Sequence, residues 1–458
     1  MLRGRVVVLS GILAVTAVTW IAQDALAIPA FTRKFGMDCS HCHTIAPGLN
    51  DFGETFRDHG HQIAGLADSL PQELRDQVGK EDPVDLHPAY WPISLRAILG
   101  YRQRSLDHQD TIAGEAKIKT RGGGIDRLEL MWGGLLAKDM NFYLMYRPAV
   151  ANAAFGESAN VVHTLAAPGG QEGELEFAWV RFDSLAGNSL LNLKLGSFEM
   201  DVPVSSHRRL TIADYPIYGH FPQGSKAAVN WSEQQLGAEL MGYNASGLRY
   251  SIAAVNGTSA HADNNMTFDY YGRVSQSLGG HRFGLFGYWG AAPTQFQQRL
   301  SAGAPVDILG TGSANKTFSR LGLDGDLRVA PLRLLFVGVH GSDGKDLFSG
   351  ANPQEATFDG GFVEAQYDLI KDWDTILVAR YDIIRNSAQG DASTPKKTGD
   401  LDGVTLAARY NLLYTSRVNV VLHGEYSHVQ TKFTSTLPIT GGNDQNDNRV
   451  MVAFDLMM

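Results

Sequence analysis

Residues 449–458 read RVMVAFDLMM, and apolar and polar side chains alternate along this stretch. Successive side chains of an extended chain point to opposite sides, so this stretch would form a strand with two unlike faces. The charged residues Arg449 and Asp455 share one face. The other face carries only apolar side chains, namely Val450, Val452, Phe454, Leu456 and Met458. Such a strand needs an apolar environment on one side only.

The same pattern recurs from about Ile93 onward, in segments of about ten residues that turn residues separate. In RVNVVLHGEYS (417–427), the apolar face holds Val418, Val420, Leu422 and Tyr426, opposite Arg417, Asn419, His423 and Glu425. In TFDYYGRVSQ (267–276), Phe268, Tyr270 and Val274 oppose Thr267, Asp269, Arg273 and Ser275. About 16 such strands, apolar toward lipid and polar toward the lumen, predict an all-β transmembrane barrel of antiparallel strands over 91–458. A large secreted β-protein is the alternative.

The connections between these strands alternate in length. Tight turns are expected at KDMN (138–141), NASG (244–247), LGGH (278–281), VAP (329–331) and IKDW (370–373). Long polar loops are expected around 151–173, 200–234, 292–315, 386–400 and 428–446. Short turns on one side and long loops on the other are typical of an outer-membrane barrel, with the short turns in the periplasm. An even number of strands puts both ends of the barrel on that side, so the preceding segment, 28–90, enters from the periplasm.

The first 27 residues predict a secretory signal peptide. Arg3 and Arg5 form a basic start, an apolar stretch of 6–20 follows, and Ala25-Leu26-Ala27 resembles a cleavage site. The mature chain would then begin near Ile28, outside the cytoplasm. A net charge of -9 argues against nucleic acid as a partner.

The stretch MDCSHCHTIAP (37–47) holds Cys39 and Cys42, the only two cysteines of 458 residues. C-x-x-C followed by His is typical of covalent attachment of haem c, with two thioethers to the cysteines and His43 as proximal iron ligand. Two cysteines allow one such haem. A disulfide or a thioredoxin-like pair would look similar, and a zinc site using His41 and His43 is a further alternative.

The distal ligand is less defined by the sequence. The segment APGLNDFGETFRDHGHQI (46–63) predicts a short helix with Pro47 in its first turn, a stop at Gly60, and an apolar face of Leu49, Phe52 and Phe56. His59 and His61 flank the glycine, and either could ligate the iron or simply lie at the surface of a helix end. His87 is a weaker candidate, and Met37 is too close to the motif for easy reach.

The N-terminal sequence resembles the fused outer-membrane monohaem c-type cytochrome–porins of the iron-oxidising type. The resemblance covers Pro29-Ala30-Phe31, Arg33-Lys34, Gly36, the haem motif and Asn50-x-Phe52-Gly53, and the plan of a small α-helical cytochrome c-like segment before a 16-stranded barrel. It implies that Cys39 and Cys42 bind one haem c and that His43 ligates its iron. It further implies iron:cytochrome c oxidoreductase activity, in which extracellular Fe(II) gives electrons to a periplasmic c-type cytochrome across the outer membrane.

One position departs from the family pattern. Many members carry Tyr after the glycine at position 60 and a Met close behind, whereas this chain has Gly60-His61-Gln62-Ile63. This departure favours His61 as the distal ligand, and two His ligands would lower the haem potential relative to a His/Met pair.

Three functions are therefore open: an inward electron conduit, a haem-plugged porin for solute diffusion, and the same conduit run outward as a reductase. The apolar band of such a barrel is about 25 Å tall, so the cytochrome segment of a conduit is expected inside the barrel mouth or lumen.

Overall fold

A computed structural model gives the fold of the chain. It describes residues 39–58, 61, 93–110, 114–137, 139–148, 174–220, 231, 233–244, 246–257, 268–291, 298–301, 304–307, 317–347, 354–370, 374–386, 397–414, 418–434 and 442–458. The expected signal peptide, 1–27, lies outside the described residues, as does most of the expected cytochrome segment, 28–90.

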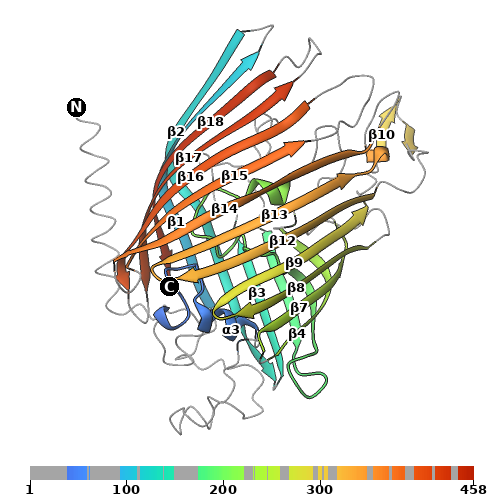
Figure 1. Cartoon of the computed structure of the whole chain (residues 1–458), viewed down its shortest axis with the longest axis vertical. Helices are drawn as coiled ribbons and strands as arrows, with labels where there is room; N and C mark the ends of the chain where they lie inside the picture. The colour runs from blue at the N-terminus through green and yellow to red at the C-terminus, as the bar shows by residue number, and fades with distance from the viewer. Residues whose placement is uncertain are drawn as a thin grey trace.

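Sixteen strands form one closed antiparallel barrel (Figure 1). The strands are β1 (Ile93–Asp110), β2 (Gly114–Ala137), β3 (Met140–Arg147), β4 (Glu174–Phe182), β5 (Asn192–Glu199), β6 (Gln234–Tyr243), β7 (Leu248–Val255), β8 (Asp269–Leu278), β9 (His281–Ala291), β12 (Thr317–Val329), β13 (Leu332–Asp343), β14 (Ala356–Ile370), β15 (Thr375–Asn386), β16 (Lys397–Tyr414), β17 (Asn419–Thr434) and β18 (Gly442–Met457). Each pairs with its neighbour in sequence, and β1 closes the barrel against β18. The predicted barrel and its strand number are confirmed. A separate hairpin, β10 (Gln298–Ser301) and β11 (Ala304–Asp307), lies in the connection between β9 and β12.

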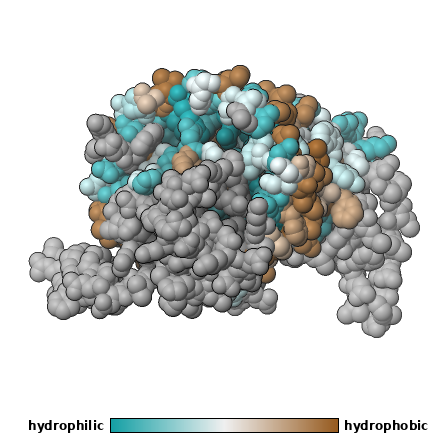
Figure 2. Space-filling view, turned by 90° about the horizontal axis from the view of Figure 1, so that it is seen from below, coloured by the Kyte–Doolittle hydropathy of each residue, from teal (hydrophilic) through white to brown (hydrophobic). Residues whose placement is uncertain are grey.

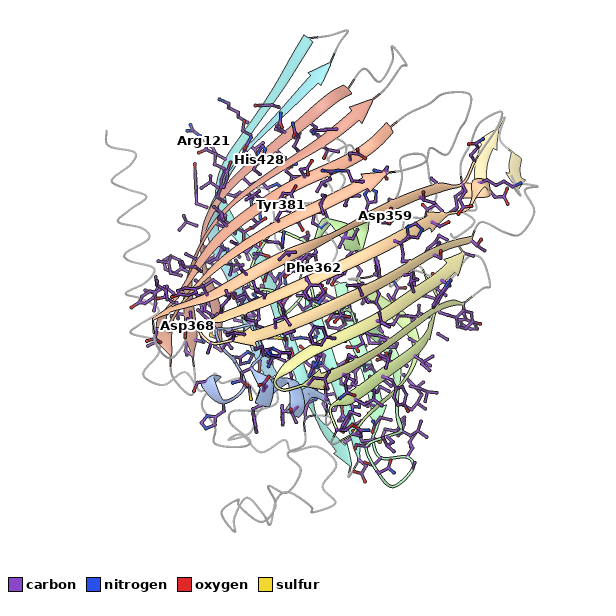
Figure 3. All side chains as sticks on the ribbon, in the orientation of Figure 1. Arg121, Asp359, Phe362, Asp368, Tyr381 and His428 are labelled. Carbon is purple, nitrogen blue, oxygen red and sulfur yellow. The ribbon has the colours of Figure 1, made fainter. Side chains whose placement is uncertain are left out.

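The two faces of the strands are as the alternation predicts. On β18, Val452 is 52% exposed, whereas Asp455 is 1% exposed. The paired strands β14 and β15 show the same contrast, since Phe362 is buried in the lumen and Tyr381 is exposed on the outside (Figure 3). Seen from below, hydrophobic side chains gather along the outside of the barrel (Figure 2). An apolar outer surface of this kind is what a lipid environment requires.

The short turns lie together at one end of the barrel. They join β2 to β3, β6 to β7, β8 to β9 and β12 to β13 at the predicted positions, while part of the IKDW turn lies outside the described residues. The chain enters β1 and leaves β18 at this same end, where the backbones of Leu95 and Met458 exchange two hydrogen bonds (Figure 1).

Two of the expected long loops are wrong in extent. Strand β16 already begins at Lys397, and β17 and β18 continue through most of 428–446. The outer end of β18, GNDQNDN (442–448), is polar on both faces, and a lumen ion pair of Arg104 with Asp447 (2.7 Å) accompanies it. Strand pairing continues there because the backbone hydrogen bonds between strands need no apolar face. A search for alternating polarity therefore misses such an end and predicts a loop.

The connection after β5 was expected as a polar loop over 200–234, but much of it folds into the lumen. Its short helix η4 (Pro216–Gly219) lies inside the barrel (Figure 1). Glu425 of β17 accepts hydrogen bonds from the amides of Ile212 and Ala213, at 2.6 and 2.8 Å. The loop packs on apolar lumen side chains in one buried cluster that includes Tyr215, Ile217, Tyr218, Trp231, Tyr271, Tyr288, Phe358 and Phe362. One side of the lumen is therefore filled rather than open.

The remaining described helical elements are short. They are η1 (Cys39–His41), α3 (Asp51–Asp58) and η5 (Lys345–Leu347). Among the residues that the structure describes, no helix is long and apolar enough to cross a membrane.

Helix α3 begins at Asp51, so the expected start near Pro47 is wrong. Asn50 is the reason, because its side-chain oxygen accepts a hydrogen bond from the amide of Gly53 at 2.9 Å and so caps the helix. Leu49 therefore precedes the helix instead of lying on its apolar face.

Candidate functional site

The cysteine motif is folded directly onto the first turn of α3. The side-chain Nδ2 of Asn50 donates a hydrogen bond to the carbonyl oxygen of Ser40, at 2.9 Å. The backbone amide of Asn50 donates a second one to the carbonyl oxygen of Cys42, at 3.0 Å. Gly53 allows the close approach, because a Cβ there would lie 2.1 Å from the Cys42 carbonyl oxygen. Asn50 and Gly53 thus hold the backbone of the motif against the helix.

This segment lies at the end of the barrel with the short turns (Figure 1). Arginines of the inner barrel wall hold it in place. The contacts are Arg409 Nη2 to Ala46 O (2.7 Å), Arg181 Nη2 to Asp58 O (2.5 Å), Arg249 Nη1 to Asp58 Oδ1 (2.6 Å), and an ion pair of Arg328 with Asp51. Residues 39–58 therefore lie against the lumen wall rather than outside the barrel. The placement of the rest of the expected cytochrome segment stays a prediction.

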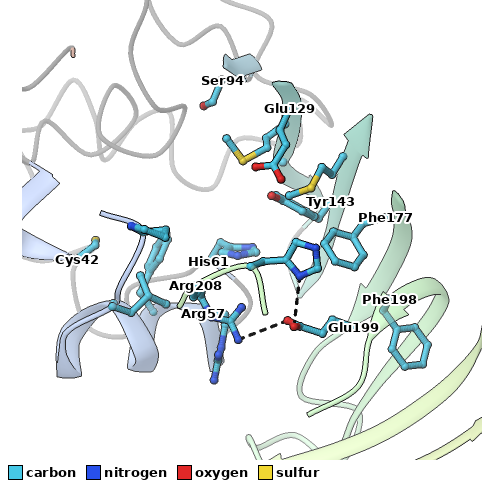
Figure 4. A pocket seen from close by; sticks show the side chains of 18 of the residues that line it. Cys42, Arg57, His61, Ser94, Glu129, Tyr143, Phe177, Phe198, Glu199 and Arg208 are labelled. Carbon is cyan, nitrogen blue, oxygen red and sulfur yellow. Dashed lines mark hydrogen bonds and ion pairs between the residues drawn. The ribbon is translucent and has the colours of Figure 1, made fainter. Parts of the chain in front are cut away.

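Beside these contacts, a cavity of about 310 Å³ lies between part of this segment and the barrel wall (Figure 4). Cys42, His43 and His61 line it from the N-terminal side. The wall opposite is largely apolar and includes Met131, Tyr143, Met145, Phe177, Trp179, Phe198 and Met241. Its volume is within the range of small-molecule and cofactor sites.

His43 is oriented by its own loop. Its Nδ1 lies 3.3 Å from the carbonyl oxygen of Gly48, and its backbone pairs with Leu49 in an isolated bridge. A carbonyl oxygen only accepts, so the proton of a neutral imidazole sits on Nδ1 and the lone pair is on Nε2. Burial lowers the pKa of His43, which favours that neutral form. A ligating His usually makes such a hydrogen bond through its second nitrogen.

His61 lies just beyond α3 and faces the same cavity. Its amide donates to the carbonyl oxygen of Phe56 at 2.9 Å, and its backbone φ of 60° lies in the left-handed region. Its ring packs against Phe56, Trp179 and Tyr143, with centroids 5.5, 6.2 and 6.4 Å away. Burial, with help from nearby Arg181, lowers the pKa of His61 to about 3, so the imidazole is neutral at physiological pH.

The other candidates from the sequence lie outside the description. His59, Gly60, Met37 and His87 are among the residues that the structure does not describe, and the same holds for the side chain of Cys39. The structure brings together Cys42, His43 and His61.

Charged side chains form part of the cavity wall, among them His207, Glu199 and Arg208, and Figure 4 shows the last two. His207 Nε2 lies 2.6 Å from Glu176 Oε1, and its Nδ1 lies 3.3 Å from Glu199 Oε1. Burial lowers the pKa of His207, but the two carboxylates outweigh it, and the net pKa is raised. Arg208 approaches Glu199 at 3.8 Å. The cavity therefore has an ionic edge beside its apolar wall.

The chemistry of these residues is compatible with a c-type haem. Two neutral imidazoles and a cysteine share one cavity with an apolar wall, which suits a flat apolar group with iron at its centre. In the part of the chain that the structure describes, no group of three or more His, Cys, Asp or Glu could hold a metal ion.

The barrel contribution to this wall was not predicted from the sequence. It comes from strands that are apolar on both faces, such as MNFYLMYR (140–147) and ELEFAWVRF (174–182). A second apolar face on a barrel strand is a usable signal, because it needs a partner inside the lumen.

Comparison with known proteins supports the fold. No family model matches the sequence, and no curated protein does. The outer membrane channel DcaP of Acinetobacter baumannii has a similar structure, with a TM-score of 0.50 at 11% identity over 80% of this chain and 97% of that chain. A loop-deletion mutant of OmpT, an outer membrane protein of Vibrio cholerae, gives a TM-score of 0.48 at 12% identity over 79% and 98% of the two chains. The chain thus has a porin-like barrel fold.

Proposed function

We propose that this barrel lies in the outer membrane, holds one haem c, and transfers electrons across that membrane. The observation that carries the proposal is that Cys42, His43 and His61 line one cavity inside the short-turn end of the barrel. In a porin for diffusion alone, a C-x-x-C-H motif inside the lumen would have no purpose.

The outer surface supports the membrane location. Large apolar side chains face outward on successive strands, and Ile252, Leu285 and Val329 are each about 60% exposed. A soluble protein rarely exposes so much contiguous apolar surface. The short-turn end, which holds residues 39–58, would face the periplasm.

The residues would divide the work of holding the haem. Cys39 and Cys42 would bind it covalently, His43 would be the proximal ligand and His61 the distal ligand. Bound in this way, the haem would supply a one-electron couple, and two His ligands would keep its potential low. Gly48 orients His43 through Nδ1, as described above.

The apolar wall would shield the haem from water, and cations and carboxylates both line the edge of the cavity. Arg57, Arg96 and Arg208 are among the residues that line it. By the family resemblance, extracellular Fe(II) would lose one electron to this site, and a periplasmic c-type cytochrome would accept it. Outward flow is the same conduit with donor and acceptor exchanged.

Spectroscopy of the purified protein tests this proposal. The wild-type protein should carry covalent haem on a denaturing gel, show a c-type spectrum, and be reduced by Fe(II) at neutral pH. Cys39→Ser/Cys42→Ser should carry none, while His340→Ala, at an exposed histidine on β13, should match the wild type. A wild-type protein without covalent haem would refute the assignment. Outward flow would be favoured by a haem that Fe(II) does not reduce, but that Fe(III) reoxidises after chemical reduction.

A porin for solute diffusion is the second candidate, with the haem segment as a plug. The likeness to a structure described as an outer membrane channel favours it. The partly filled lumen opposes it, because the 200–220 loop and an apolar cluster occupy one side. Conductance in planar bilayers separates the two: a conduit should pass little ion current, and an open-porin current would favour diffusion.

A further inference from the structure

A second, smaller cavity lies beside the first and is unusually basic. It measures about 60 Å³ and is bounded by α3, the start of the 200–220 loop and the wall from β7 to β14. Eight arginines and four carboxylates line it. The carboxylates are Glu54, Asp201, Asp324 and Asp326.

The carboxylates are already shared between arginines. Asp201 bonds Arg249 at 2.8 Å and Arg273 at 3.2 Å. Asp326 likewise bonds Arg328 at 2.7 Å and Arg333 at 2.8 Å. Each of these acids therefore faces two guanidiniums. Three of these arginines have a second carboxylate partner, since Arg249 pairs with Asp58, Arg273 with Asp324 and Arg328 with Asp51.

Two arginines are left with little neutralisation. The nearest ion-pair partner of Arg208 is Glu199, at 3.8 Å. For Arg282, no carboxylate among the described residues lies within ion-pair distance, and its Nε is 3.5 Å from Ser277 Oγ. Both lie close enough to Arg57 and Arg249 to feel their positive charge, and burial together with Arg57 lowers the pKa of Arg208.

Arg208 and Arg282 are half-buried beside the cavity, while the other arginines that line it have close carboxylate partners. A half-buried guanidinium without a close carboxylate is available to an anion. Guanidinium groups bind carboxylate and phosphate oxygens particularly well, because their planar N–H donors match the oxygen pairs. A cavity of about 60 Å³ has room for a group of that size, since one water needs about 10–15 Å³.

We propose that this cavity is a binding site for a small oxyanion, a carboxylate or a phosphate, held by Arg208 and Arg282. The anion has two possible sources. Arg57, Arg208 and Arg249 line both cavities, so the carboxylate of a haem in the larger cavity would be one source, and a free anion from solution would be the other. The proposal itself does not depend on the haem.

Calorimetric titration with inorganic phosphate tests the site in the full-length, detergent-purified protein. It is done on the wild type and on Cys39→Ser/Cys42→Ser, which lacks covalent haem. Phosphate binding in both identifies a free oxyanion site. Binding only in the second identifies the haem carboxylates as the natural occupant. Binding in neither overturns the proposal, whether or not the wild type carries haem.

Variants then locate the site, in whichever protein form binds phosphate. Arg208→Gln/Arg282→Gln should weaken binding at least tenfold, and Arg282→Gln alone should weaken it if the double variant fails to fold. Arg121→Gln is the matched control, because Arg121 is exposed on β2 and lines neither cavity (Figure 3). Equal weakening in the control would also overturn the proposal, because it would reduce the effect to overall charge.

Discussion

Replacing Asn50 should loosen the haem motif without disturbing the barrel. Asn50→Ala removes the helix cap to Gly53 and the hydrogen bond to Ser40, each 2.9 Å long. A lost cap costs about 1 kcal/mol and a lost hydrogen bond about 1 kcal/mol, so local opening should become about 2 kcal/mol easier. That corresponds to about 30-fold faster hydrogen exchange in α3.

Asn50→Asp is the matched variant for this experiment. It keeps an oxygen for the cap but has no N–H for the Ser40 carbonyl, so it should lose about 1 kcal/mol and exchange about 5-fold faster. Asn244→Ala serves as a control, because Asn244 caps a tight turn far along the chain, where its side chain accepts from the amides of Ser246 and Leu248.

The assay is hydrogen exchange by mass spectrometry under conditions where exchange reports the opening equilibrium. Peptides from α3 should respond in the two Asn50 variants, and barrel peptides should not. Unchanged exchange in α3, or an equal change in β16 to β18, would refute the reasoning that Asn50 ties the motif to the helix.

Other predictions follow from the same site. His61→Met should raise the haem potential in a redox titration. His61→Ala should change the absorption spectrum of the ferric haem. If neither the potential nor the spectrum changes, His61 is not the distal ligand. Gly53→Val should fold as a barrel but carry less covalent haem on a gel, because the side chain would collide with the Cys42 carbonyl. The His207 pKa is raised in the folded state, so its stabilising effect is present below pH of about 6.5 and is lost as pH rises through the folded pKa. Thermal unfolding between pH 5 and 9 should show that loss in the wild type, and His207→Gln should remove this part of the pH dependence.

The barrel could be predicted because its physical cause is local. Alternation along stretches such as 449–458 records which side chain meets lipid, and a tight turn such as LGGH records where a hairpin closes. Neither signal needs knowledge of distant contacts. The polar strand end 442–448 lacks the alternation, so the sequence predicts a loop there.

The candidate site was only half predictable. C-x-x-C-H is a contiguous motif, so Cys42 and His43 stand out in the sequence. The helix start differs from the prediction because Asn50, and not Pro47, sets the first turn through its cap to Gly53. The cavity wall depends on closure of the barrel, which brings residues as distant as Met131 and Met241 to one place. The inward fold of the 200–220 loop likewise depends on lumen partners such as Glu425.

Electron transfer into sealed vesicles tests the central claim most directly. The protein is reconstituted in liposomes that contain an oxidised soluble c-type cytochrome, and an Fe(II) chelate that does not cross lipid is added outside. The account predicts that the enclosed cytochrome is reduced by the wild type and not by Cys39→Ser/Cys42→Ser. An enclosed cytochrome that stays oxidised with haem-loaded wild type, or that is reduced equally by the cysteine variant, would contradict it.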